Sequence, residues 1–297
     1  MPFKSGFVTV IGVPNAGKSS LVNALVKETV TIVTAKPQTT RKRTMGILNK
    51  ENEYQIIFVD TPGVIESDAG LNSYLKTELN NSLKDVDVVV AAVAPWEFQK
   101  EEKPWALKVC EKFDGKVIYI ATQTDKKSPA PDHEARLTRW NTWTENTPLL
   151  ETSSRNREGV EELKLLVIEK LPEGPQYYDV DLFTPQTMRE MTGEVIRKQC
   201  FELLHQEIPY GLAVLIRTFE EGNCYKVEGD IIVSKDSHKG MVIGKGGGVL
   251  KQIGTRARFE LERMFNHKMN LKLHVVVKPA WIKDRQYLQE LGYVSEK

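Results

Sequence analysis

The chain has 297 residues, of which 40% are hydrophobic and 27% charged, and this length and composition exclude a disordered protein and allow two domains. The 41 lysines and arginines nearly cancel the 40 aspartates and glutamates, so the overall charge indicates no partner. Three widely separated cysteines argue against a disulfide framework. Neither the cysteines nor the five histidines have the spacing of metal ligands, so we expect no metal cage.

The N-terminal part enters a strand-like run at once, FVTVIGV at residues 7–13, which leaves no room for a signal peptide. The apolar run VDVVVAAVA at residues 86–94 is far shorter than the ~20 residues that a membrane-spanning helix needs. We therefore expect a cytoplasmic chain without an integral membrane segment.

The first half alternates strand-like and helix-like segments. Near-continuous apolar strands that alternate with helices indicate a mostly parallel sheet covered on both faces. We predict an α/β doubly wound domain over residues 1–172. Its expected strands are 7–13, 54–61, 86–94, 116–123 and 148–154, and its expected helices are 19–28, 71–83 and 159–171.

The pattern changes at LPEGP, residues 171–175, where two prolines and a glycine end the last helix. We expect a connector over residues 173–184 and a second, α+β domain over residues 185–297. This domain is expected to hold a helix at 185–207, strands at 211–221 and 224–235, a glycine-rich turn, a helix at 249–265 and a strand at 271–278.

A glycine-rich loop, GVPNAGKS at residues 12–19, follows the first strand and precedes a helix. This context predicts a phosphate loop, in which the glycines let successive N–H groups face an anion. Lys18 would reach the β and γ phosphates, and the Ser19 hydroxyl would hold Mg²⁺. The first half is thus predicted to be a P-loop NTPase. The nucleotide contacts expected here are Gly12, Asn15, Ala16, Gly17, Lys18, Ser19 and Ser20.

Two further segments are expected at the same site. FVDTPG, residues 58–63, ends the next strong strand, so Asp60 is placed to hold a magnesium-bound water and the Gly63 N–H to meet a γ-phosphate. The basic loop KPQTTRKR, residues 36–43, offers threonines that close over Mg²⁺ in the triphosphate state. The predicted metal ligands are Ser19, Thr40 and Asp60, and the predicted nucleotide contacts of the turn are Asp60, Thr61, Pro62 and Gly63.

The strand VIYIA runs into Thr122-Gln123-Thr124-Asp125. Asp and Thr commonly stop strands, and a carboxylate at this place can also read the edge of a base. Both interpretations stay open on this segment alone. Its position on the fourth strong strand after a phosphate loop favours the base reader.

Together these motifs resemble GTPases related to translation factors, and the whole chain resembles the Era family of ribosome-assembly GTPases. The resemblance covers GVPNAGKS, PQTTRKR, DTPG, the connector LPEGPQYY, the segment MVIGKGGGVLKQIG and the ending LGYV. It implies GTP and GDP as ligands with Mg²⁺, and slow GTP hydrolysis stimulated by RNA. It also implies a cytoplasmic protein, with peripheral contact at the inner face of the cell membrane as a further candidate.

The segment VIGKGGG lies between an apolar residue and a helix, as expected of a GxxG loop that clamps a nucleic-acid backbone. Basic residues dominate positions 235–258, which favours phosphate binding. The resemblance implies a type II KH domain that binds the 3′ end of 16S-type RNA of the small ribosomal subunit. The expected RNA contacts are Ile243, Gly244, Lys245, Gly246, Gly247, Lys251 and Arg256.

The residue after DTPG is Val64, so the visible motifs offer no side chain that positions the attacking water. Catalysis is then expected to rest on Mg²⁺, Lys18, Thr40 and the Gly63 N–H. Asn15 matches the asparagine that coordinates K⁺ in potassium-dependent relatives, so K⁺ is a candidate cofactor.

The base-reading motif departs from the family's Asn-Lys-x-Asp. Asp125 remains, while Thr122 offers one hydrogen bond and Gln123 lacks the charged stem of lysine, so we expect guanine specificity at reduced affinity. Ser153 and Ser154 stand where relatives have Ser-Ala.

Three functions stay open: a GTP-hydrolysing assembly factor, an RNA-binding assembly protein with a weak or degenerate nucleotide site, and a P-loop ATPase that remodels RNA. Asp125 argues against the ATPase. Trp96, Phe98 and Trp105 are either a partner surface or, as we favour, partly buried packing.

Overall fold

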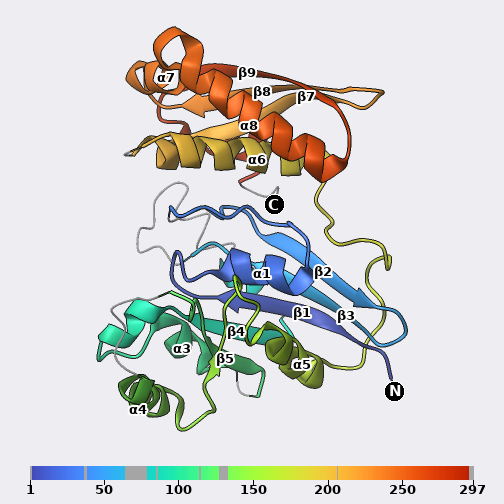
Figure 1. The fold of residues 1–297 in the computed structure, drawn as a ribbon, viewed down its shortest axis with the longest axis vertical. Coiled ribbons are helices and arrows are strands. Elements are labelled where there is room, and N and C mark those ends of the chain that lie inside the picture. The colour runs from blue at the N-terminus through green and yellow to red at the C-terminus, as the bar shows by residue number, and fades with distance from the viewer. Residues whose placement is uncertain are drawn as a thin grey trace. The chain divides into compact units, whose positions relative to one another are not determined.

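The computed structural model describes residues 2–36, 39–63, 79–84, 86–113, 115–126, 133–205 and 207–293. The chain divides into two compact units (Figure 1). Unit 1 comprises Met1–Thr31, Thr40–Ile65 and Leu75–Pro185, and unit 2 has its body in Gln186–Lys297 and also takes in Ile32–Thr39.

Unit 1 is built on a six-stranded sheet in the order β2-β3-β1-β4-β5-β6. All neighbouring strands are parallel except β2 and β3, which are antiparallel. The doubly wound, mostly parallel sheet predicted from the sequence is confirmed, with β2 as an additional edge strand. The strands are β1 (Lys4–Ile11), β2 (Thr44–Lys50), β3 (Tyr54–Asp60), β4 (Val88–Val93), β5 (Val117–Ala121) and β6 (Leu150–Glu151).

Helices cover both faces of this sheet. Apolar residues of α1 (Lys18–Val26) and α5 (Val160–Lys170) share one buried cluster with β1, β3 and β4. Residues of α3 (Trp105–Cys110) and α4 (His133–Thr144) share a second cluster with the opposite faces of β4 and β5. Helices α3 and α4 were not predicted, and the helix expected over residues 71–83 lies mostly outside the described residues.

The aromatic segment after β4 is packing. Phe98, in the 3₁₀ turn η1 (Pro95–Gln99), is fully buried, with its ring centroid 6.2 Å from that of Trp140 and 5.4 Å from that of Trp143. Trp96 and Trp105 are partly buried.

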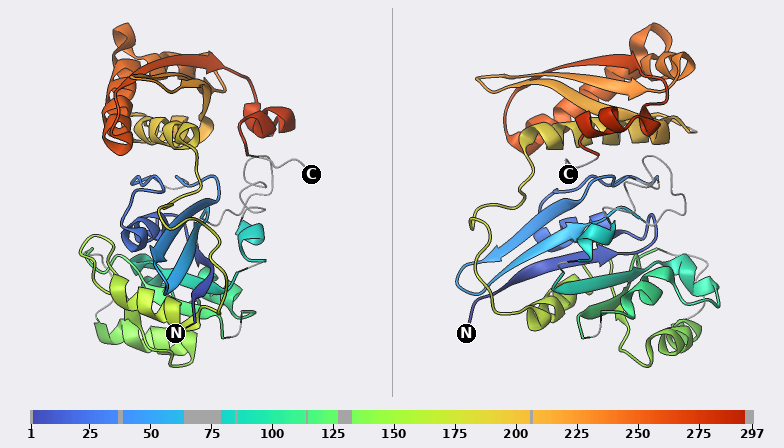
Figure 2. Two further views of the ribbon diagram at one scale, coloured as in Figure 1. Left: turned by 90° about the vertical axis from the view of Figure 1, so that its right-hand side faces the viewer. Right: turned by 180° about the vertical axis from the view of Figure 1, so that it is seen from behind.

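The connector after α5 belongs to unit 1 and follows the edge strand β2 and its neighbour β3. The Gln55 side chain accepts hydrogen bonds from the Tyr177 and Tyr178 N–H groups and donates to the Tyr178 carbonyl. Asn49 donates to the carbonyls of Val180 and Leu182. Figure 2 shows this yellow-green segment beside the blue strands. Backbone and side-chain hydrogen bonds thus hold residues 177–182 against the sheet.

Unit 2 has a three-stranded sheet in the order β7-β8-β9, with β7 antiparallel and β9 parallel to β8. Its elements follow the order α-β-β-α-α-β of the predicted type II KH fold, and helices α6 and α8 pack on the sheet (Figure 1). A glycine-rich turn was expected where α7 lies. The elements are α6 (Met188–Leu203), η2 (Ile208–Gly211), β7 (Ala213–Glu220), β8 (Tyr225–Val233), α7 (Asp236–Ile243), η3 (Lys245–Gly247), α8 (Gly248–Phe265), β9 (Met269–Val277), η4 (Trp281–Lys283) and α9 (Arg285–Glu290).

Thr187 begins α6 with a reciprocal cap, because its hydroxyl accepts from the Glu190 N–H and its own N–H donates to the Glu190 carboxylate.

Among the residues that the structure describes, no helix is long and apolar enough to cross a membrane.

Candidate nucleotide and RNA sites

The phosphate loop connects β1 to α1, as the sequence predicts. Gly17 has φ of 87° and precedes the first helical residue, Lys18. This left-handed backbone is accessible to glycine at little cost, so Gly17 lets the loop turn into the helix N-terminus. A Cβ on Gly12 would lie 2.7 Å from the Ala92 carbonyl oxygen, so this position needs glycine for space. The loop therefore has the geometry that presents N–H groups to phosphate.

Lys18 is buried, and its ammonium donates to the carbonyls of Gly12 and Val13 at 3.1 and 3.0 Å. Burial lowers the pKa of Lys18 to about 8, and the negative charges of Asp60 and Glu97 oppose this shift. A buried ammonium beside a helix N-terminus is suited to bind a phosphate anion.

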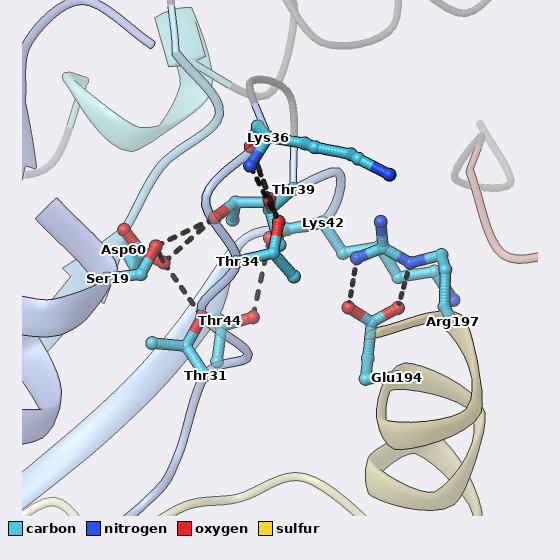
Figure 3. Close-up of polar contacts among 11 residues, drawn as sticks. Ser19, Thr31, Thr34, Lys36, Thr39, Lys42, Thr44, Asp60, Glu194 and Arg197 are labelled. Atoms are coloured by element: carbon cyan, nitrogen blue, oxygen red, sulfur yellow. Dashed lines mark hydrogen bonds and ion pairs between the residues drawn. The ribbon is translucent and has the colours of Figure 1, made fainter. Parts of the chain in front are cut away.

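Hydroxyl groups gather around Asp60 at the end of β3 (Figure 3). The Ser19 hydroxyl donates to Asp60 Oδ2 at 2.6 Å, and the Thr40 hydroxyl lies 3.2 Å from the same oxygen and 2.9 Å from Ser19 Oγ. The other carboxylate oxygen, Oδ1, is buried and has no partner among the described residues. Desolvation raises the pKa of Asp60, since this carboxylate is fully buried.

This donor set fits Mg²⁺, which prefers oxygen ligands and uses few protein side chains together with phosphate oxygens. The unpartnered Asp60 Oδ1 and the lone pairs of Ser19 and Thr40 are the atoms that would face the ion or its bound water. The predicted metal ligands, Ser19, Thr40 and Asp60, are thus brought together. Within the described ranges, no group of three or more His, Cys, Asp or Glu residues has the geometry of a metal site.

The DTPG turn lies against the phosphate loop. A Cβ on Gly63 would be 2.8 Å from the backbone of Pro14, so only glycine allows this approach. The Thr61 hydroxyl donates to the Val10 carbonyl of β1 and fixes the turn. Pro62 joins these two residues. Val64, Pro37 and Gln38 lie outside the described residues.

Gln123 connects the base-reading segment to the phosphate loop. Its side-chain amide Nε2 donates to the Asn15 carbonyl, and both residues have left-handed backbones, with φ of 56° and 63°. The Gln123 side chain also lies over Gly17, where a Cβ would be 3.1 Å from Nε2. The glutamine therefore has a structural role that the sequence did not reveal.

Asp125 is held in place by Ser153. The Ser153 hydroxyl donates to Asp125 Oδ1 at 2.7 Å and accepts from the Asn156 N–H at 3.1 Å. The second oxygen, Oδ2, lies 4.0 Å from the exposed guanidinium of Arg155. Asp125 thus keeps acceptor capacity for a base, and the segment with Ser153 and Ser154 lies beside it.

The Thr122 hydroxyl makes an internal hydrogen bond in the described structure. It donates to the Val93 carbonyl at 3.2 Å, and the residue is buried. The same carbonyl also accepts from the Thr122 N–H at 2.9 Å. A hydrogen bond from this hydroxyl to the base stays a prediction, and Asp125 offers the other contact to the base edge.

The glycine loop of unit 2 lies between α7 and α8. Gly244, Gly246 and Gly247 have φ of 73°, 58° and 77°, so the loop has a backbone that favours glycine. No atom lies within 4 Å of a Cβ built on Gly246 or Gly247, which leaves the outer side of the loop open to a ligand.

The predicted RNA contacts lie in this loop and on the helices α7 and α8 that flank it. The side chains of Lys245, Lys251 and Arg256 are exposed, and Ile243 is half-buried at the end of α7. Exposed cations beside an open glycine backbone suit a chain of phosphates.

Three residues near the nucleotide site were not predicted. Glu97 is buried near Lys18 and accepts from the Ala94 N–H, and desolvation raises its pKa. Thr31 donates to Asp60, and Asn23 of α1 holds the Thr31 backbone. No spacing rule reveals these residues, because their proximity arises only in the folded chain.

Comparison with known proteins agrees with this geometry. Residues 7–123 match the family model described as 50S ribosome-binding GTPase, and residues 207–282 match the KH domain model. The curated GTPase Era of Clostridium perfringens is 38% identical over 99% of this chain and 100% of its own length, and that of Clostridium botulinum is 36% identical over the same shares.

Two solved structures are similar over nearly the whole chain. A single-substitution variant of Aquifex aeolicus Era, bound to GDP·AlF₄⁻, has a TM-score of 0.91 at 31% identity, covering 98% of this chain and 100% of that one. Era in complex with MgGDPNP and nucleotides 1506–1542 of 16S ribosomal RNA has a TM-score of 0.92 at 31% identity, covering 99% and 100%.

Fold and site define a P-loop GTPase domain joined to a C-terminal KH domain. The chain belongs to the Era family of GTPases.

Proposed function

We propose that this GTPase binds Mg²⁺·GTP in unit 1, hydrolyses it slowly, and binds the 3′ end of 16S-type ribosomal RNA through unit 2 during assembly of the small ribosomal subunit. The observation that carries the proposal is the bond from Gln123 to Asn15, which joins a phosphate loop to the segment that carries Asp125. A relative with the same domains was solved with MgGDPNP and this part of the RNA.

Different groups of the chain bind the phosphates, the metal ion and the base. Lys18 and the loop N–H groups bind the phosphates, Gly63 presents its N–H to the terminal phosphate, and Asp125 accepts from the guanine edge. Mg²⁺, when bound, neutralises the charge that develops on the phosphate oxygens. Ser19, Thr40 and Asp60 would hold it.

Two finer assignments are part of the proposal. Asn15, in a left-handed and exposed position of the phosphate loop, is proposed as a K⁺ ligand, so hydrolysis should be faster in K⁺ than in Na⁺ at equal ionic strength.

A cytoplasmic location, with peripheral contact at the inner face of the membrane, is proposed from the family resemblance alone. We also propose the limits 1–172, 173–184 and 185–297 for the two domains and their connector.

Gly246→Asp tests the RNA half. Binding of a 3′-terminal RNA fragment to the full chain is measured by filter retention, and GTP hydrolysis is measured on the same samples. We expect the variant to lose RNA binding because its carboxylate repels phosphate, while basal hydrolysis persists.

Gly222→Asp is the matched control. It places the same charge in unit 2 at another glycine where a Cβ meets no atom within 4 Å. This control should keep RNA affinity. Equal RNA affinity in Gly246→Asp and the unchanged protein would refute the glycine loop as the RNA clamp.

A further inference from the structure

One oxygen of Asp60 has more hydrogen-bond donors than it can satisfy. Figure 3 shows Ser19 and Thr31 beside Asp60. The hydroxyls of Ser19, Thr31 and Thr40 lie 2.6, 2.9 and 3.2 Å from Oδ2, while Oδ1 has no partner among the described residues. A carboxylate has about four lone-pair sites, which is two for each oxygen. Three donors therefore compete for two sites, and Thr40, at the longest distance, is the weakest of them.

Thr40 also has an alternative partner, because its hydroxyl lies 2.9 Å from Ser19 Oγ. Ser19 can donate its proton to Asp60 and still have lone pairs to offer to a cation. Both groups can therefore turn oxygen lone pairs towards Mg²⁺. The Thr31 hydroxyl, by contrast, donates to the Asp60 carboxylate and is not a predicted Mg²⁺ ligand.

Thr31 is held rigidly from α1. Asn23 Oδ1 accepts from the N–H groups of Val30 and Thr31 at 3.0 and 3.1 Å, and Asn23 Nδ2 donates to the Thr31 carbonyl at 2.8 Å. Thr31 is 5% exposed. Three hydrogen bonds from one side chain thus fix the backbone that carries this hydroxyl, and α1 begins at the phosphate loop itself.

We propose that Thr31 is a positioning residue for Mg²⁺: it orients the Asp60 carboxylate through a fixed hydrogen bond, and Asn23 couples this orientation to the phosphate-loop helix. The inference rests on the proposed Mg²⁺·GTP site. Partners of metal-binding groups in the outer coordination sphere commonly change metal affinity by ten- to a hundredfold when they are removed.

The test is the dependence of nucleotide release on free Mg²⁺, measured on the full chain with fluorescent N-methylanthraniloyl-GDP. Thr31→Val removes the donor and keeps the shape, and Thr31→Ser keeps the donor. We expect Thr31→Val to raise the Mg²⁺ concentration for half-maximal slowing of release by about tenfold. Thr31→Ser should have the same half-maximal Mg²⁺ concentration as the unchanged protein. The rate of release without Mg²⁺ should be equal in the unchanged protein and both variants.

Thr9→Val is the matched control, since the hydroxyl of the buried Thr9 of β1 donates to the Ser82 carbonyl and not to Asp60. It should leave the Mg²⁺ dependence unchanged. If Thr31→Val does not fold, Thr31→Ala takes its place in the comparison.

Two results would overturn the inference: an unchanged Mg²⁺ dependence in the folded donor-free variant, or faster release in the absence of Mg²⁺ by the same factor as in its presence. Absence of nucleotide binding by the unchanged protein would instead contradict the proposed function.

Discussion

The side-chain amide of Gln123 donates to the main-chain carbonyl of Asn15, and this bond ties the segment after β5 to the phosphate loop after β1. Gln123 stands where the family motif has lysine. A neutral amide thus makes the connection, without the charge that a lysine would add. The base-reading and phosphate-binding segments are thereby held together before nucleotide arrives, which lowers the ordering cost of binding.

Gln123→Ala should weaken GDP binding about fivefold, because it removes one hydrogen bond worth about 1 kcal/mol between the two segments. The dissociation constant is measured by fluorescence titration. Gln176→Ala is the matched control, since Gln176 makes its side-chain hydrogen bond to Tyr178 in the connector. Equal GDP affinity in Gln123→Ala and the unchanged protein would show that the bond does not contribute.

Asp125→Asn should move base preference from guanine towards xanthine. The carboxylate accepts from the guanine edge, whereas an amide can donate to the carbonyl that xanthine has at the corresponding position. We expect GTP affinity to fall by more than about tenfold and XTP affinity to rise, measured by competition against labelled GDP. A parallel loss of both nucleotides would mean that Asp125 supports the fold of the segment and does not read the base.

Ser153→Ala should weaken GTP binding while keeping the preference for guanine over xanthine. This change removes the donor to Asp125 Oδ1 and leaves the carboxylate itself. The loss should be about 1 kcal/mol, or roughly fivefold in affinity. A reversal of base preference in this variant would contradict the assignment of base reading to Asp125.

Above pH 8 the protein should take up a proton on Lys18 when nucleotide binds. Burial holds the pKa of Lys18 at about 8 in the free protein, against 10.5 in an exposed lysine, and bound phosphate favours the charged ammonium. Between pH 8 and 10.5 the nucleotide-bound protein therefore holds more protons than the free protein, so the affinity for nucleotide falls as the pH rises. Calorimetry of GDP binding at pH 9, in two buffers of different ionisation enthalpy, should give close to one proton per site. Uptake of no proton would show that Lys18 does not change its charge.

The same pKa affects stability in the opposite direction. The unfolded chain binds more protons on Lys18 than the folded chain between pH 8 and 10.5, so this group's contribution to the free energy of unfolding rises with pH in that range.

The sequence predicted those elements that have long apolar runs and missed those that depend on their surroundings. Strand β4 was predicted because it is apolar along its whole length, and β1 because its second half, residues 7–11, is mostly apolar. Helix α4 has only Trp140, Trp143 and Thr144 buried, so it lacks a periodic apolar stripe. Strand β2 was missed because it follows a basic loop and pairs at the sheet edge. Helix α7 was missed because it contains Gly240 and ends at the glycine loop, so its sequence was interpreted as part of a turn.

The site divides in the same way. Lys18, Asp60 and Asp125 could be singled out from the sequence because fixed spacing within one segment indicates their chemistry. Thr31 and Asn23 were missed because a threonine has no chemical signature until the fold brings it within hydrogen-bond distance of Asp60. Gln123 was predicted to be a weaker substitute for lysine, and only the folded chain shows the bond that it makes to the phosphate loop.

The site with Asp125 is expected to select guanine although Thr122 gives its hydroxyl to Val93. The most direct test of this selectivity is to titrate the full chain with GTP and with ATP at saturating Mg²⁺ and to compare the dissociation constants. We expect micromolar affinity for GTP and an ATP affinity at least a hundredfold weaker, since a site built to accept from guanine leaves its acceptors unpaired with adenine. Equal affinity for GTP and ATP, or binding of neither, would show that this site does not select guanine nucleotides.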